Sequence, residues 1–203
     1  IIAKKDAIFE EALLHCDVLL PDGIGIVLAS KIFNIKGLKK IAGADIHQYL
    51  LTQANKNGQS VFYVGATEST LQIIEDKVRA TCPKIRVGSF CPPFTAAFSS
   101  DDTEEMITAI NSFKPDVLFV GMTAPKQEMW VHRNKEDIHA PVIASIGAAF
   151  DFYAGTIKRP GPFWVKLGLE WLIRLLREPK RLWKRNFVST PLFLWDVLKE
   201  KFS

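Results

Sequence analysis

The feature that most constrains the fold is a series of short, mostly apolar runs, each ending at a glycine or a proline-containing turn. In chain order they cover residues 18–20, 60–64, 84–87, 117–120 and 141–146. Hydrophobic runs of this length, without polar alternation, are typical of strands buried on both faces of a parallel sheet. We therefore interpret all five as strands.

Amphipathic stretches separate these runs. Apolar residues recur at helical spacing over residues 45–57, 67–81 and 101–113, and a helical pattern begins near Ile8. The third stretch opens with capping residues. Strands alternating with helices predict an α/β fold, a Rossmann-like three-layer sandwich with a mostly parallel sheet. Residues 90–100 read as a loop.

Charge divides the chain into two parts. Residues 158–203 hold eleven Lys or Arg against four Asp or Glu and four of the five tryptophans, whereas residues 1–157 hold 15 basic against 18 acidic residues. We expect a Rossmann-like core over residues 1–157 and a basic, helical C-terminal appendage over residues 158–203.

The appendage has the composition of an interfacial helix. Residues 166–177 place basic residues on one helical face and Leu and Trp on another, Pro179 interrupts this helix, and a second basic stretch follows at residues 180–185. This pattern predicts binding to an anionic membrane surface. A helix pair packed on the core or in a homo-oligomer interface is the alternative. We expect no nucleic acid partner, because no nucleic-acid-binding motif accompanies the charge.

Three cysteines without C-x-x-C spacing argue against a disulfide framework or a zinc site and favour a reducing, cytosolic setting. The four histidines show no metal-ligand spacing. Because the sequence starts at Ile1 and a helical pattern follows at once, we expect a further N-terminal segment that includes an early strand. The chain also lacks a D-x-D carboxylate pair, so we predict no metal and no cofactor.

Ligands of open parallel sheets bind beyond the carboxyl ends of the strands. Asp22 follows the first apolar run, where partial burial would raise its pKa and suit a general base; the same position also suits a helix cap. Gly23-x-Gly25 resembles the start of a dinucleotide fingerprint without its third glycine. The turn at residues 64–67 offers backbone N–H groups to a phosphate.

Residues 125–128 open a further helix. Its first turn projects Lys126, Gln127 and Glu128 toward the strand ends, unless the turn is simply solvated.

Taken together, several blocks from about residue 15 to residue 187 resemble the WecG/TagA/CpsF glycosyltransferase family. They are P-D-G-x-G from Pro21, A-G-x-D from Ala42, G-A at Gly65, G-x-x-A-P-K-Q-E-x-W from Gly121, G-x-x-F-D-x-x-A-G from Gly147, G-L-E-W-x-x-R from Gly168 and E-P-x-R from Glu178. Lys40 stands where the family usually has Arg, and residues 86–98 do not follow the family pattern.

The resemblance implies an inverting, metal-independent transfer of a sugar, such as N-acetylmannosamine, from a UDP-sugar donor to undecaprenyl-diphosphate-linked N-acetylglucosamine in teichoic acid or surface polysaccharide synthesis. It implies that Asp22 is the general base and that Gln127 contacts the donor sugar or the diphosphate. Gly65, Ala66 and Asp151 would lie along the nucleotide.

The same resemblance assigns two tasks to the appendage. Arg174 and Arg181, with Arg185, would close over the site and neutralise the leaving diphosphate. Lys40, outside the appendage, would bind the substrate in place of the family's Arg. The appendage would also hold the protein on the inner face of the cell membrane, in the cytoplasm. Two other functions stay open from the residues: an NAD(P)-dependent oxidoreductase, and a non-catalytic, membrane-associated nucleotide-binding protein.

Overall fold

A four-stranded parallel sheet forms the centre of the protein in a computed structural model that describes residues 1–158, 160–161, 163–164, 169–177 and 179–202. The strands are β1 (Ser60–Gly65), β2 (Arg86–Phe90), β3 (Val117–Gly121) and β4 (Val142–Ser145). Their order is β2-β1-β3-β4. In the central pair, Val61 lies opposite Val117 and Gly65 opposite Gly121. The predicted parallel sheet is confirmed.

The position of each strand in the sheet follows from its side chains. Every residue of β1 is buried, and so are the first four of β3. These two strands have neighbours on both edges and helices on both faces, so polar positions would be costly there. β4 is an edge strand and leaves Val142 and Ser145 exposed.

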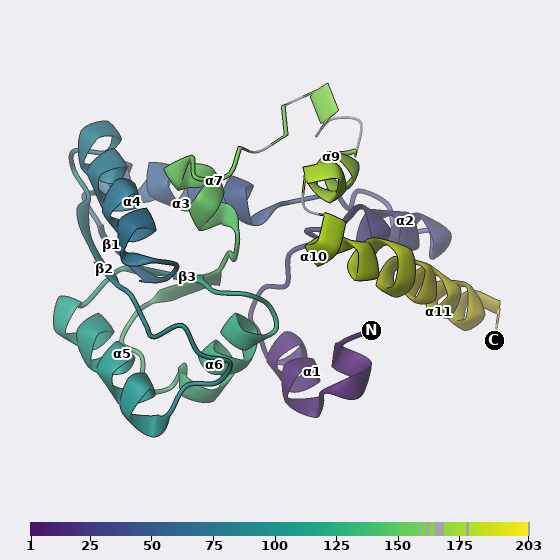
Figure 1. Ribbon diagram of the computed structural model, residues 1–203, viewed down its shortest axis with the longest axis horizontal. Coiled ribbons are helices and arrows are strands. Elements are labelled where there is room, and N and C mark those ends of the chain that lie inside the picture. The colour runs from purple at the N-terminus through teal and green to yellow at the C-terminus, as the bar shows by residue number, and fades with distance from the viewer. Residues whose placement is uncertain (159, 162, 165–168, 178, 203) are drawn as a thin grey trace. The chain divides into compact units, whose positions relative to one another are not determined.

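Helices cover both faces of the sheet and complete three layers (Figure 1). Tyr63 and Phe119 point into a core shared with α3 (Gly43–Asn57), α4 (Glu68–Thr81) and α7 (Ala149–Ala154). Residues of the opposite face pack on α5 (Ser100–Phe113) and α6 (Lys126–Asn134). The Rossmann-like sandwich is therefore confirmed, as are the three helices expected before β1, β2 and β3.

Local capping explains where two of these helices begin. The Thr67 side chain accepts from the Thr70 N–H and caps α4. Ser99 and Asp102 form a reciprocal capping box at the start of α5, which satisfies two backbone donors that would otherwise lack partners.

Two predicted strand positions are wrong. Residues 18–20 form no strand: Val18 and Leu19 are 72% and 64% exposed. A run of three residues makes too few backbone hydrogen bonds to hold a register, and no described strand pairs with it. β2 begins at Arg86 rather than Lys84, and it continues through Gly88 to Phe90. A side chain at position 88 would meet the Phe113 ring at 2.6 Å, which explains the glycine inside this strand.

The chain forms two compact units. One comprises Asp6–Asp17 and Gly43–Lys158, which hold the sheet and α1 (Ala7–Leu14); the other comprises Ile1–Lys5, Val18–Ala42 and Arg159–Ser203. The second unit contains the short 3₁₀ helix η1 (Ala3–Lys5), α2 (Ile24–Ile32), α9 (Glu170–Arg177), α10 (Pro179–Lys184), the π-helix η2 (Arg185–Ser189) and α11 (Thr190–Phe202).

Within the second unit, α2 packs on α11: a side chain at Gly25 would lie 3.6 Å from the Phe193 ring. The structure describes α9 over Glu170–Arg177 and α10 from Pro179; residue 178, between them, lies outside the described residues, so the predicted interruption by proline stays a prediction. None of the described helices has the length and apolarity needed to cross a bilayer.

Candidate active site

The carboxyl ends of β1 and β3 are locked together by a close backbone contact. Gly65 has φ +125°, and a Cβ there would lie 2.3 Å from the carbonyl oxygen of Gly121. The Ala66 N–H donates to that same oxygen at 3.2 Å. Only glycine fits position 65, because this backbone region is closed to side chains.

This contact corrects one expectation about the turn. The backbone N–H groups of residues 64–67 were expected to be free for a phosphate, but the Ala66 N–H is held by the Gly121 carbonyl. Thr67 then caps α4, whose first-turn N–H groups follow directly on the strand end. Those groups, rather than the Ala66 N–H, suit an anion at this edge.

Gln127 is the most buried polar side chain near the strand ends, with 4% of its surface exposed. Its Oε1 accepts from the Met122 N–H at 3.1 Å, and its Nε2 donates to Oε1 of Glu128 at 2.8 Å. A Cβ at Gly147 would lie 3.7 Å from both amide atoms. Gln127 therefore lies between the segments that follow β3 and β4. The alternative of a solvated first turn is wrong.

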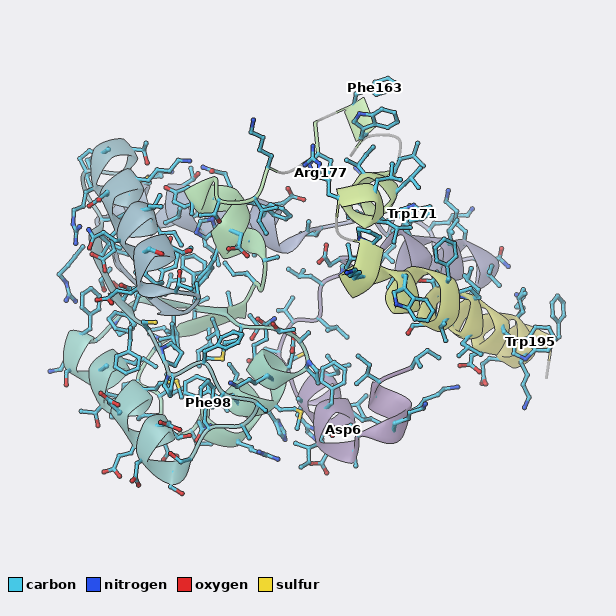
Figure 2. The ribbon with its side chains drawn as sticks, in the orientation of Figure 1. Asp6, Phe98, Phe163, Trp171, Arg177 and Trp195 are labelled. Atoms are coloured by element: carbon cyan, nitrogen blue, oxygen red, sulfur yellow. The ribbon has the colours of Figure 1, made fainter. Side chains whose placement is uncertain are left out.

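Lys126 joins this helix start to the loop after β2. Its Nζ donates to the Thr95 carbonyl at 2.6 Å and lies 3.5 Å from the centre of the Phe98 ring. Phe98 is labelled in Figure 2. Burial lowers the pKa of Lys126, while the Asp102 carboxylate acts in the opposite direction. Residues 86–98, which do not follow the family pattern, thus form β2 and a loop that contacts α6 through Lys126.

Asp151 lies in the first turn of α7, just after β4. Its Oδ1 accepts from the Thr156 hydroxyl at 3.2 Å. The preceding Phe150 packs on the end of β3, where a side chain at Gly121 would meet its ring at 2.5 Å. The structure thus gathers Gly65, Ala66 and Gln127 at the carboxyl edge of the sheet, with α7 and Asp151 following from the same edge.

Asp22 and Lys40 belong to the second unit and lie on adjacent segments there. The Ile41 N–H donates to the Pro21 carbonyl at 3.1 Å, which joins the two stretches. The N-cap of α2 is Gly23, not Asp22. Asp22 is also exposed, so the expected partial burial is wrong.

The three predicted arginines are also in the second unit. Arg174 is in α9, Arg181 in α10 and Arg185 in η2. Only their backbone is within the described part of the structure, and their side chains lie outside it. Their assigned roles stay predictions.

Sequence reasoning gave no role to two further side chains of the first unit. Glu128 was expected at the helix start without a function, yet it is the partner of Gln127. His47, read as an ordinary histidine, is 2% exposed, and burial lowers its pKa to about 4. Among the described residues, no three His, Cys, Asp or Glu side chains gather in a way that could hold a metal ion.

The nicotinamide interpretation loses its structural basis. A dinucleotide fingerprint needs a strand before its glycines, and residues 18–20 are not one.

Similarity to known proteins identifies the family of the chain. The sequence matches the profile described as "Glycosyl transferase WecG/TagA/CpsF family" over residues 1–203. The chain belongs to this family of glycosyltransferases. The match covers both compact units, so the segments holding Asp22 and the appendage arginines are family segments as much as the sheet is.

Curated relatives within the family share one name. A Bacillus spizizenii protein named N-acetylglucosaminyldiphosphoundecaprenol N-acetyl-beta-D-mannosaminyltransferase is 31% identical over 199 residues, 98% of this chain and 75% of its own length. A Bacillus subtilis protein of that name gives the same identity and coverage. One from Staphylococcus aureus strain MW2 is 30% identical over 191 residues, 94% of this chain and 72% of its own.

Proposed function

We propose that this glycosyltransferase moves N-acetylmannosamine from a UDP-linked donor to N-acetylglucosamine on a diphosphoundecaprenol acceptor. The observation that carries the proposal is the shared name of relatives that match 94–98% of the chain at 30–31% identity. The strand-edge turn at Gly65, followed by the start of α4, supports a nucleotide at the place where open parallel sheets hold their ligands.

The reaction we propose is a single displacement with inversion. The acceptor hydroxyl attacks the anomeric carbon of the donor sugar, the bond from that carbon to the diphosphate oxygen breaks, and UDP leaves with the electron pair. Asp22 takes the proton of the hydroxyl. Its exposure leaves the carboxylate within reach of a large acceptor.

Cationic side chains would stabilise the leaving group. The sequence has no D-x-D pair to hold a divalent ion against the diphosphate. We assign to Arg174, Arg181, Arg185 and Lys40 the neutralisation of the negative charge that develops on the leaving diphosphate. Fixed cationic groups of this kind stabilise a transition state electrostatically. Gly65, Ala66 and Asp151 would border the nucleotide, and Gln127 the donor.

The appendage would place the enzyme at its acceptor. Four large apolar side chains of α11 are exposed: Leu192, Trp195, Leu198 and Phe202. Trp195 is labelled in Figure 2 and is 68% exposed. Together with the basic residues of the appendage, this face supports peripheral attachment to an anionic membrane, which we place at the cytoplasmic surface.

Transfer assays with the full-length protein test the proposal. Several UDP-sugars, UDP-N-acetylmannosamine included, are offered with a soluble diphosphate-linked N-acetylglucosamine acceptor, and product and UDP are measured. We expect transfer by the natural protein, none by Asp22→Asn, and retained UDP affinity in that variant. Asp17→Asn, an exposed carboxylate outside the proposed site, is the matched control.

Two results would overturn the assignment. Full activity of Asp22→Asn would remove the general base. Bilayer binding without UDP release from any UDP-sugar would instead identify a non-catalytic nucleotide-binding protein.

A further inference from the structure

A short segment of the second unit, outside the appendage, exposes basic and apolar side chains together. Residues 31–41, here called the lysine segment, contain four lysines and no Asp or Glu. Four large apolar side chains of this segment are 36–57% exposed: Phe33, Ile35, Leu38 and Ile41. A side chain at Gly37, in the middle of the segment, would meet no described atom within 4 Å, so this part stands clear of the fold. Apolar side chains gathered on such a surface indicate a binding partner.

Backbone hydrogen bonds fix both parts of the lysine segment to the rest of the unit. The Ile35 N–H donates to the Ser30 carbonyl of α2 at 2.7 Å. At the other end, the Ile41 N–H donates to the carbonyl of Pro21, the residue before Asp22, at 3.1 Å. The structure therefore joins this surface to the proposed general base.

The exposed surface continues from the lysine segment along α2. Ile24 and Leu28 are 36% and 42% exposed, and with the exposed Lys31 they follow each other at the spacing of one helical face. Another face of α2 packs on α11, where a side chain at Gly25 would lie 3.6 Å from the Phe193 ring (Figure 1). The helix thus buries one face on the appendage and leaves a second face exposed.

The charge of the lysine segment decides which partner fits. An anionic bilayer suits both kinds of side chain, because lysines pair with its headgroups while apolar side chains enter the interface. A second copy of the chain fits poorly, since a symmetric contact would set the four lysines against the same four of the copy. A soluble polyanion would pair with the lysines but leave the apolar side chains in water.

We propose that the lysine segment and the exposed face of α2 form a second membrane-contacting surface, which binds anionic phospholipid headgroups in addition to the exposed side chains of α11. Docking of this surface brings Asp22 to the level of the headgroups, where the diphosphate and sugar of a lipid-linked acceptor lie. This last step rests on the proposed function, whereas the lipid contact itself does not.

Sedimentation with vesicles tests the proposal in the full-length protein. The vesicles contain phosphatidylglycerol with phosphatidylcholine, or phosphatidylcholine alone. The double variant Lys36→Ala, Lys39→Ala should bind the anionic vesicles about 10- to 30-fold more weakly and the neutral vesicles as before. The double variant Ile35→Ser, Leu38→Ser should bind both kinds about 10-fold more weakly, because insertion of apolar side chains does not depend on lipid charge.

Matched controls come from the first unit. Lys56→Ala with Lys84→Ala removes two exposed lysines, and Ile73→Ser removes an isoleucine of α4 that is 42% exposed. These variants should bind vesicles as the natural protein does. Thermal unfolding should give one Tm for all of the proteins, since every replaced side chain is exposed.

Transfer assays separate docking from chemistry. Both variants of the lysine segment should keep the kcat/KM of the natural protein with a soluble acceptor, because they leave Asp22 and Lys40 in place. With a lipid-linked acceptor in anionic vesicles, their rates should fall as their vesicle binding falls.

Two outcomes would overturn the proposal. Anionic-vesicle binding equal to that of the natural protein in both variants would remove the lipid contact. Conversion of a dimer into a monomer by Ile35→Ser, Leu38→Ser in analytical ultracentrifugation would identify an interface between copies of the chain instead. If the natural protein transfers no sugar, the proposed function fails, and vesicle binding still decides the role of the lysine segment.

Discussion

The Nε2 atom of His47 lies 2.8 Å from the hydroxyl oxygen of Tyr63 in the centre of the first compact unit. The rings of Phe119 and Tyr153 stand edge-on to the imidazole, with centroids 4.8 and 4.7 Å away. Burial lowers the pKa of His47 to about 4, because a charged imidazole would lose its hydration among these rings. The folded protein thus holds a neutral histidine in its core.

This pair predicts acid lability of the fold. The pKa of His47 rises from about 4 in the folded state to its ordinary value of 6.5 on unfolding, so the unfolded chain binds the extra proton between those values. The stability that the neutral His47 contributes to the fold is fully present above about pH 6.5 and is lost as the pH falls toward 4. Its size is on the order of 3 kcal/mol.

Urea unfolding between pH 7 and pH 4 measures this effect. His47→Gln should show a shallower pH dependence than the natural protein, whereas His139→Gln, which removes an exposed histidine, should keep the original slope. Equal slopes for all three proteins would contradict the assignment to His47.

Gly65 supplies a second prediction, on the strand-edge turn. In Gly65→Ala the new methyl would lie 2.3 Å from the Gly121 carbonyl oxygen, at a φ that side chains rarely adopt. We expect a loss of at least about 3 kcal/mol in unfolding free energy, together with weaker UDP binding. Gly58→Ala is the control, since Gly58 has φ +67° but no neighbouring atom within 4 Å. The unfolding free energy of Gly58→Ala should fall by only about 1 kcal/mol, and its UDP affinity should stay unchanged.

Asp116 predicts a stability effect without a catalytic one. Its Oδ2 accepts from both the N–H and the hydroxyl of Ser60, each at 2.7 Å, at the start of β1 and β3. These hydrogen bonds lower the pKa of Asp116. The stability that the carboxylate contributes to the fold is therefore present above the ordinary carboxyl pKa and is lost as the pH falls below it. The strand starts are the edge opposite the proposed site.

Asp116→Asn should therefore reduce the unfolding free energy by about 1–3 kcal/mol while leaving kcat/KM unchanged at temperatures where the variant is folded. Asp101→Asn, which removes an exposed carboxylate of α5, should leave both the unfolding free energy and kcat/KM unchanged. A lower kcat/KM for fully folded Asp116→Asn would show that the sheet register at this edge also sets the site.

The central strands could be read from the sequence because burial on both faces leaves an uninterrupted apolar run, as in β1 and β3. The same rule failed for Val18 and Leu19, because an apolar run does not reveal whether a partner strand exists. Gly88 was read as the end of a strand, yet it lies inside β2, where the Phe113 ring leaves no room for a side chain. That ring comes from α5, and no local pattern reports it.

The candidate site shows the same division. Gly65 and Gln127 were found because parallel strands bring their carboxyl ends to one edge, which follows from chain order alone. The engagement of the Ala66 N–H by Gly121 could not be foreseen, since it joins two strands far apart in sequence. Glu128 carried no signal of its own. Its hydrogen bond with Gln127 depends on the orientation of that amide, which Met122 sets through space.

The appendage arginines give the last prediction, which separates chemistry from membrane binding. If Arg174 and Arg181 neutralise the leaving diphosphate, Arg174→Ala and Arg181→Ala should each slow transfer to a soluble acceptor by about 100-fold. Lys201→Ala, which removes a cation from the exposed end of α11, should leave the rate of transfer to the soluble acceptor unchanged. Trp195→Ala should weaken binding to anionic vesicles, measured by sedimentation. An unchanged soluble-acceptor rate in both arginine variants would reduce the appendage to a membrane anchor, because an anchor has no effect on a substrate that is already in solution.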